Sequence, residues 1–306
     1  MVENTRWFDR LALTVLLLGA ATTLIPLYLM MTTATLPGEA ILGNNLSWLP
    51  GDRLLANLSS AWTKIDLGRL LINSMIVSLI VVVGKLALAS ITAFAIVFVD
   101  SVLADAIFWI VLLTLMLPLE VRIVPTYAVA ADVLLPLQTI LTVTGLDRLV
   151  AWLAGIHVSL GWNLLDTYAG LTLPLIGTAM GTFLFRQFYR TVPPDLIEAA
   201  RMDGVGPIRF FVDFLLPLSK ANFAALACLM FVSSWNQYLW PLLVTTNAAM
   251  RTAVVGVAAL KPSDPYGASS WNLVMAAGLV TMFPPVAVVA LLQRWFVKGL
   301  MAGGGK

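Results

Sequence analysis

The chain alternates between long apolar stretches and short polar connections. Crossing the hydrocarbon core of a bilayer as a helix takes roughly 20 predominantly apolar residues. Six stretches fit this requirement, and we predict a transmembrane helix at each: 11–31, 70–98, 106–130, 168–186, 221–246 and 271–293. Prolines inside several of them predict kinked spans, because neighbouring helices can satisfy the carbonyls that a proline frees. The pattern predicts an all-α membrane protein with six transmembrane helices.

The first apolar stretch follows Arg6 and Arg10, as the apolar region of a secretory signal peptide would. It runs for about 20 residues, longer than such a region and long enough to span a bilayer. No small-residue cleavage pattern closes it convincingly. We therefore predict an uncleaved first span.

Composition supports a membrane protein and excludes several other classes. Hydrophobic residues make up 60% of the 306 positions and charged residues only 11%, against about 25% charged residues in soluble domains. The net charge of +2 leaves no basic patch for nucleic acid. Cys228 is the single cysteine, so an intrachain disulfide is impossible.

Lysine and arginine in the connections predict the orientation, since cytoplasmic loops carry an excess of them. With the N-terminus inside, ten lie on the cytoplasmic side and seven outside. The bias is clearest after the fourth span, where Arg186 and Arg190 follow. The segment 99–105 is an exception, because it carries Asp100 and Asp105 but no cation. We predict a multi-pass protein of the inner (cytoplasmic) membrane with both termini in the cytoplasm.

The segment 132–167 is apolar but interrupted, among other places at Asp147 and Arg148. Its uninterrupted pieces are short for a span, which needs about 17–25 residues. One extra span would also invert everything downstream, against the charges after the fourth span. We predict an outside insertion. It is either a loop that packs on the bundle or a pair of short surface or re-entrant helices.

No catalytic constellation is recognisable. The chain has no GxSxG, HExxH, CxxC or P-loop pattern, and its one histidine, His157, has no partner histidine or cysteine cluster. His157 is thus more typical of a loop residue than of a metal ligand. We expect no enzyme active site, no metal site and no nucleotide site, although a carboxylate-based membrane enzyme stays open.

The connection between the fourth and fifth spans carries the most informative pattern. Asp195 with Glu198 three residues later predicts a capping box and a short helix that starts there. Gly204 is suited to end it, and Pro207 to begin a second helix that runs to Pro217. A short helix between two spans has charges and small residues free for a partner. It is either a docking helix for a soluble subunit or an ordinary cytoplasmic loop helix.

The same connection, 188–217, contains Glu198-Ala199-Ala200, then Gly204 after three residues, and Phe214-Leu215-Leu216-Pro217 after nine more. This pattern resembles the EAA loop of ABC importer permeases, in which a cytoplasmic coupling helix enters a groove of the ATP-binding subunit. Phe214, where isoleucine is usual, is a conservative departure. The residues that the resemblance implicates in coupling to the ATPase are Glu198, Ala199, Ala200, Asp203, Gly204, Leu216 and Pro217.

Other stretches resemble one group within that family, the carbohydrate-uptake permeases that include the maltose G-type subunit. The most similar members are the E-type membrane subunits of sn-glycerol-3-phosphate uptake systems. The stretches that carry this likeness are Leu115–Ile123, Tyr168–Leu175, Phe183–Phe188 and Trp235–Leu243. The likeness covers nearly the whole chain apart from much of 132–167.

This resemblance implies a type I ABC importer permease fold. It also implies a second (A-type) permease subunit, two ATP-binding subunits that hold ATP and Mg, and a periplasmic or surface solute-binding protein. The chain itself would hold no cofactor and would contact membrane lipid but no nucleic acid. The implied solute is sn-glycerol-3-phosphate. The alternatives are the same machine for a neutral sugar or oligosaccharide, and a non-transporting membrane scaffold or enzyme.

Ionisable residues in spans are functional candidates, because burying a charge in a membrane is costly. Lys85, Glu120 and Arg122 are the ones in or near the predicted spans, and a phosphorylated solute would require cations. The alternative for Lys85 is a pairing with a carboxylate or carbonyl of another helix. A cluster in the fifth span adds candidates for the wall of the solute path, with helix–helix packing as the alternative: Trp235, Asn236, Gln237 and Tyr238.

Overall fold

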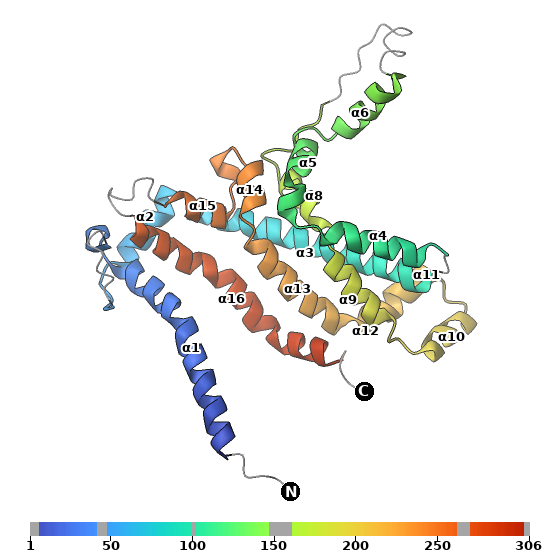
Figure 1. Ribbon diagram of the computed structural model, residues 1–306, viewed down its shortest axis with the longest axis horizontal. Helices are drawn as coiled ribbons and strands as arrows, with labels where there is room; N and C mark the ends of the chain where they lie inside the picture. Colours follow the sequence, from blue (N-terminus) through green and yellow to red (C-terminus); the bar gives the residue numbers. More distant parts are fainter. Residues whose placement is uncertain (1–5, 42–47, 100–101, 147–160, 262–269, 303–306) are drawn as a thin grey trace. The chain divides into compact units, whose positions relative to one another are not determined.

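The computed structural model describes residues 6–41, 48–99, 102–146, 161–261 and 270–302 (Figure 1). In these ranges the chain is helical and contains no β-strand. The principal helices are α1 (Arg6–Thr35), α2 (Leu54–Lys64), α3 (Leu67–Phe98), α4 (Ala104–Met116), α5 (Leu119–Ala131), α6 (Leu135–Thr144), α8 (Tyr168–Ile176), α9 (Ala179–Tyr189), α10 (Pro194–Met202), α11 (Pro207–Phe210), α12 (Leu216–Leu218), α13 (Lys220–Trp235), α14 (Leu239–Val244), α15 (Ala253–Ala259) and α16 (Trp271–Ala302). His157 and the predicted interruption at Asp147 and Arg148 lie outside the described residues.

Three helices are each long and apolar enough to cross a membrane: Trp7–Thr35, Leu67–Phe98 and Trp271–Gln293. Three pairs of consecutive helices meet the same condition together but are bent, by 86° between α5 and α6, 46° between α8 and α9, and 75° between 207–218 and α13. The described chain thus holds three such helices, or up to six spans if each bent pair counts as one.

The chain divides into two compact units, the first formed by residues 1–71 with 255–284. Its core contains buried Ala61, Leu67, Leu260 and Ala277. Buried Asn57 closes the end of α1, because its Nδ2 donates to the carbonyls of Ala34 and Leu36, both at 2.8 Å. This satisfies carbonyls that a helix end leaves without intrahelical partners.

The second unit comprises residues 72–254 with 285–306. Its core packs side chains of α3, α5, α8 and α14, among them buried Val81, Leu171 and Trp240. The Oδ1 atom of Asn73 in α3 accepts a hydrogen bond from the Tyr168 hydroxyl (2.8 Å), and its Nδ2 donates to the carbonyl of Ala249 at 2.8 Å. These contacts fix α8 and the segment after α14 against α3.

The expected third span, 106–130, is not one helix but two. Helix α4 ends at Met116 and α5 begins at Leu119. Leu117 between them is extended (φ −64°, ψ 127°), because a proline, here Pro118, disfavours the helical conformation of the residue before it. The kink expected from proline is therefore a complete break.

The expected fifth span, 221–246, is also interrupted. Helix α13 ends at Trp235 and α14 begins at Leu239. Pro241 lies in the first turn of α14, and a proline can neither bond to the carbonyl four residues earlier nor avoid crowding it. That carbonyl belongs to Gln237, so the break falls where the proline requires it.

The fourth expected span breaks at Gly177 between α8 and α9, and the Thr178 side chain caps α9 by accepting from the Gly181 amide (3.4 Å). Inside α8, Pro174 leaves the carbonyl of Gly170 without its helical donor. The indole Nε1 of buried Trp240 donates to that carbonyl at 3.1 Å. A neighbouring helix thus satisfies the freed carbonyl, as is required away from water.

Part of the expected outside insertion, 132–167, is described. Helix α6 projects from the rest of the second unit (Figure 1), and none of its residues is buried. The returning segment is tied down at Asp166, whose carboxylate accepts hydrogen bonds from the Thr246 hydroxyl and the Asn247 amide. These donors hold the pKa of the Asp166 carboxyl below its usual range.

Candidate functional site: the EAA loop and the helix breaks

The first helix of the EAA loop, α10, starts one residue before the predicted cap. Its first residue is Pro194, its N-cap is Pro193, and no side chain caps it. The predicted capping box of Asp195 and Glu198 is therefore wrong. Pro193 precedes a proline and is held extended, while Pro194 has the φ that a first helical residue needs. Asp195 instead lies in the first turn, where its charge favours the positive helix end.

The end of α10 is a Schellman motif built on Gly204, as the glycine predicted. Gly204 has φ +70°, its amide donates to the carbonyl of Arg201 (3.0 Å), and the amide of Val205 donates to that of Ala200 (3.0 Å). Both hydrogen bonds satisfy carbonyls of the last turn. The left-handed conformation fixes the direction in which the chain leaves the helix.

The two faces of α10 differ in what they can contact. Ala200 is 5% exposed and faces the rest of the unit, whereas Glu198 and Ala199 are exposed. Asp203 is also exposed, and Met202 beside it is 83% exposed. The outer face of α10 thus presents small, charged and apolar side chains to the surroundings.

The second half of the loop begins at Pro207, as predicted, and continues through a π-helical turn, Phe211–Leu215, to Leu218. Leu216 is half-buried and Pro217 exposed. The chain then bends by 75° into α13. Ser219 at this bend is 0% exposed, and its hydroxyl donates to the carbonyl of Leu215. The bend is therefore a buried part of the unit.

Aromatic rings connect the EAA loop to the end of α3 and the end of α9. Phe98, in the last turn of α3, lies 5.6 Å from the Phe210 ring and 5.9 Å from the Tyr189 ring of α9. Phe94, one turn earlier, lies 5.1 Å from Phe211. We call these five residues the aromatic anchor. Ring pairs at such separations stabilise beyond their buried area.

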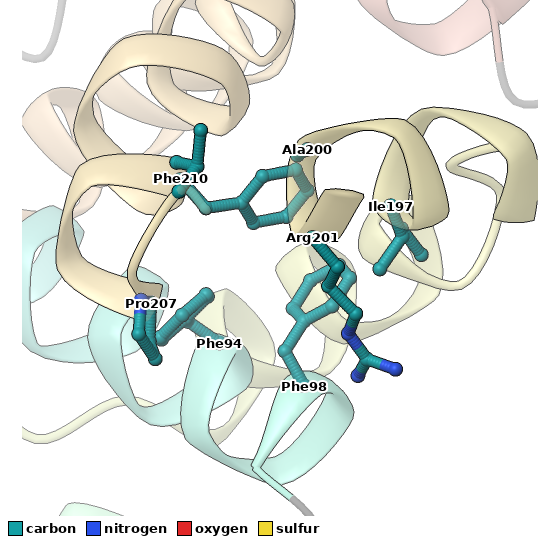
Figure 2. A pocket seen from close by; sticks show the side chains of 8 residues that line it. Phe94, Phe98, Ile197, Ala200, Arg201, Pro207 and Phe210 are labelled. Carbon is teal, nitrogen blue, oxygen red and sulfur yellow. The ribbon is translucent and has the colours of Figure 1, made fainter. Parts of the chain in front are cut away.

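A cavity of ≈ 180 Å³ lies between the anchor and α10 (Figure 2). Phe94, Phe98 and Phe210 line one part of it, and Ile197 and Ala200 of α10 line another. The inner face of α10 therefore lies over the end of α3.

The candidate cations for the solute path lie near the helix breaks. Gly84 approaches α8 so closely that a Cβ there would be 2.7 Å from Ile176, the residue just before the break at Gly177. Lys85 follows it in α3, and Arg122 lies in α5. In the described part of the chain neither cation forms an ion pair, and the buried Nε of Arg122 has no hydrogen-bond partner. Glu120 is exposed and pairs with neither cation.

The aromatic and amide cluster lies at the break between α13 and α14. Trp235 is 2% exposed and its ring stacks on Phe231 with centroids 5.7 Å apart, so it packs inside the unit. Asn236 and Tyr238 are exposed and Gln237 is half-buried. Only these last three offer appreciable surface to a solute or partner.

Several residues of the site were missed by sequence reasoning. The anchor has a visible signal, since Phe94 and Phe98 are four residues apart on one helical face. Which aromatic residues they meet is decided by the tertiary structure. Met202 and Ile208 are apolar residues in a polar connection, and their exposed fractions of 83% and 81% show that the loop does not bury them.

Apolar helices long enough to span a membrane, three bent helix pairs and a short helix over the end of α3 are the features expected of a polytopic membrane protein. Residues 85–301 match the family described as binding-protein-dependent transport system inner membrane component. The sn-glycerol-3-phosphate transport system permease protein UgpE of Pectobacterium atrosepticum is 41% identical over 307 residues, covering 98% of this chain and 99% of that protein. UgpE of Yersinia enterocolitica is 42% identical over 308 residues, with the same coverage. The chain belongs to this family, whose members are permeases of ABC importers.

The fold is also that of a solved transporter. A chain from a bacterial ABC transporter involved in the import of the acidic polysaccharide alginate superposes with a TM-score of 0.72. The match covers 97% of this chain and 99% of the other at 17% sequence identity. This likeness confirms the predicted all-α permease fold.

Proposed function

We propose that this chain is a permease subunit of an ATP-driven importer of sn-glycerol-3-phosphate and forms half of its translocation path. The observation that carries the proposal is the 40–42% identity to permeases named for that solute, over nearly the full length of each chain. A second, A-type permease subunit would supply the other half, and an outside solute-binding protein would deliver the solute.

The cations at the helix breaks support an anionic solute. A phosphate monoester carries a charge of about −1.5 to −2 near neutral pH, and moving it through a low-dielectric bundle without compensation is very costly. Lys85 and Arg122 lack a carboxylate partner among the described residues. An entering phosphate would supply the missing negative charge, with arginine able to bind two of its oxygens.

The EAA loop is the proposed connection to the ATPase. Two partner subunits would hold ATP and Mg, and this chain would have no nucleotide site of its own. The outer face of α10, with Glu198, Ala199 and Met202, would lie in a groove of one partner. Because the inner face rests on the end of α3, closure of the ATP-binding subunits would move α3 and switch the side on which the path opens.

This role places the EAA loop and both termini in the cytoplasm of a cell with the chain in its inner membrane. The segment 99–105 would then be cytoplasmic, although it carries aspartates and no cation. Asp105 forms an ion pair with Arg186 of α9, at 3.0 Å between Oδ1 and the guanidinium, so a cation of α9 compensates its charge. In a Cys228→Ala background, an impermeant thiol reagent should label a cysteine at position 60 but not at position 190 in intact cells.

Uptake into vesicles that contain the complete reconstituted transporter tests the proposed solute. We expect ATP-dependent uptake of sn-glycerol-3-phosphate and none of maltose. Arg122→Gln should lower uptake while complex yield and basal ATP hydrolysis stay normal, and Lys85→Met should do the same. Uptake of a neutral sugar, or unchanged uptake in both variants, would contradict the assignment of these cations.

A further inference from the structure

A second cavity, of ≈ 560 Å³, lies beside the EAA loop, where the end of α3, the start of α4 and the end of α9 meet α10. Among the described residues, its charged lining is Arg186, Arg190 and Arg201 with the carboxylate of Asp105. Three of the four elements are ends of apolar helices, which fits a position near the lipid headgroups. The described lining carries a surplus of positive charge.

Arg186 is held in a fixed position. Its side chain is 11% exposed, one terminal nitrogen is 3.0 Å from Asp105, and its guanidinium carbon lies 4.0 Å from the centre of the Phe108 ring. Its buried Nε has no hydrogen-bond partner in the described part of the chain. Arg190 and Arg201 are exposed and form no ion pair with any described residue. One fixed and two free guanidinium groups thus share a cavity.

This arrangement suits a phosphate group. The planar guanidinium matches phosphate oxygens in pairs, and basic pockets between membrane helices on the cytoplasmic side bind phospholipid headgroups. We propose that the cavity binds a phosphate group, supplied by the headgroup of an anionic phospholipid or by free inorganic phosphate. Arg201 belongs to α10 and also lines the cavity over the aromatic anchor, so the bound group braces α10 against α9. The inference is independent of the solute carried.

Two variants of opposite expected effect test the site in the assembled transporter. Arg190→Gln with Arg201→Gln removes two exposed cations and leaves the buried Arg186 in place. Asp105→Asn removes the carboxylate that competes for Arg186. Arg209→Gln is the matched control, because Arg209 is an exposed arginine of the same loop, pairs with Asp213 at 3.1 Å and does not line the cavity.

The readout is the thermal unfolding midpoint of the transporter in phosphatidylcholine nanodiscs. It is titrated with phosphatidylglycerol in one arm and with sodium phosphate, at constant ionic strength, in the other. A ligand of the native state raises this midpoint. We expect wild type and Arg209→Gln to respond alike. The double variant should need about a hundredfold more ligand, since each of the two lost charge-assisted hydrogen bonds has roughly a tenfold effect. Asp105→Asn should need less.

A response to phosphatidylglycerol alone identifies a lipid headgroup, and a response to phosphate alone identifies the free ion. Either supports the site. No response of wild type to either probe overturns it, as do equal titrations of wild type and the double variant. If the double variant fails to assemble, the Asp105→Asn titration decides: tighter binding supports the site, and unchanged or weaker binding refutes it.

Discussion

Gly204 provides the sharpest test of the EAA loop, because a second glycine two residues away serves as its control. Gly204 has φ +70° at the end of α10, whereas Gly206 has φ −70° and ψ 162°, a conformation open to any residue. A Cβ at either position would meet nothing within 4 Å. Alanine at the two sites therefore differs in backbone strain and not in packing.

The magnitude follows from the conformation. A Cβ in the left-handed region costs about 1–2 kcal/mol, which changes an equilibrium by a factor of about 5–30. In Gly204→Ala the equilibrium between the closed and the opened Schellman motif at the end of α10 should shift toward the opened form by that factor. Gly206→Ala should be close to neutral, because the gain of about 0.4–1 kcal/mol from restricting the unfolded chain is offset by the poorer N-cap that alanine gives α11. Gly204→Asn should lie between wild type and Gly204→Ala, since asparagine tolerates this region.

The assay is solute-stimulated ATP hydrolysis and uptake by the reconstituted transporter, with complex yield from co-purification. Gly204→Ala should lower stimulation several-fold, while Gly206→Ala behaves as wild type. Equal activity in all three variants would show that the ending of α10 does not matter for coupling. Equal losses in Gly204→Ala and Gly206→Ala would show that the loop tolerates no side chain, for reasons other than strain.

Three further predictions concern other parts of the second unit. Phe210→Ala should destabilise the transporter by about 3 kcal/mol in thermal unfolding, since Phe210 is 6% exposed, and should abolish solute stimulation; Phe210→Leu should do much less. Ala199→Trp, at an exposed site, should leave the unfolding midpoint of the purified permease unchanged but prevent its co-purification with the ATP-binding subunit. A normal yield of the complex would refute docking through this face. The pKa of Asp166 is depressed, so its stabilisation is complete above about pH 4, the usual carboxyl range, and is lost as pH falls through the lower native pKa. The difference in midpoint between wild type and Asp166→Asn should therefore be constant from pH 8 to pH 5 and shrink only in stronger acid.

The sequence by itself determined the class of fold and the location of the short loop helices between the fourth and fifth spans. Apolar length is a property of local sequence, and it predicted the long helices around 11–31, 70–98 and 271–293. Gly204 and Pro207 act on their own backbone, so the end of one loop helix and the start of the next were predictable. The cap at Asp195 failed because the proline pair before it set the start of the helix.

Only the tertiary structure decided what the breaks and the anchor do. Pro174 predicts that one carbonyl of α8 lacks its helical donor. Which residue satisfies that carbonyl depends on how α14 packs on α8, and it is Trp240. Phe98 and Phe210 are 112 positions apart in the chain and meet only because α10 folds back over the end of α3. Likewise, the sequence places Asp105 in a connection without a cation, and only the structure shows that Arg186 of α9 forms an ion pair with it. Propensity, length and backbone restriction act over a few neighbouring residues, whereas these contacts join distant segments whose meeting depends on the packing of the whole unit.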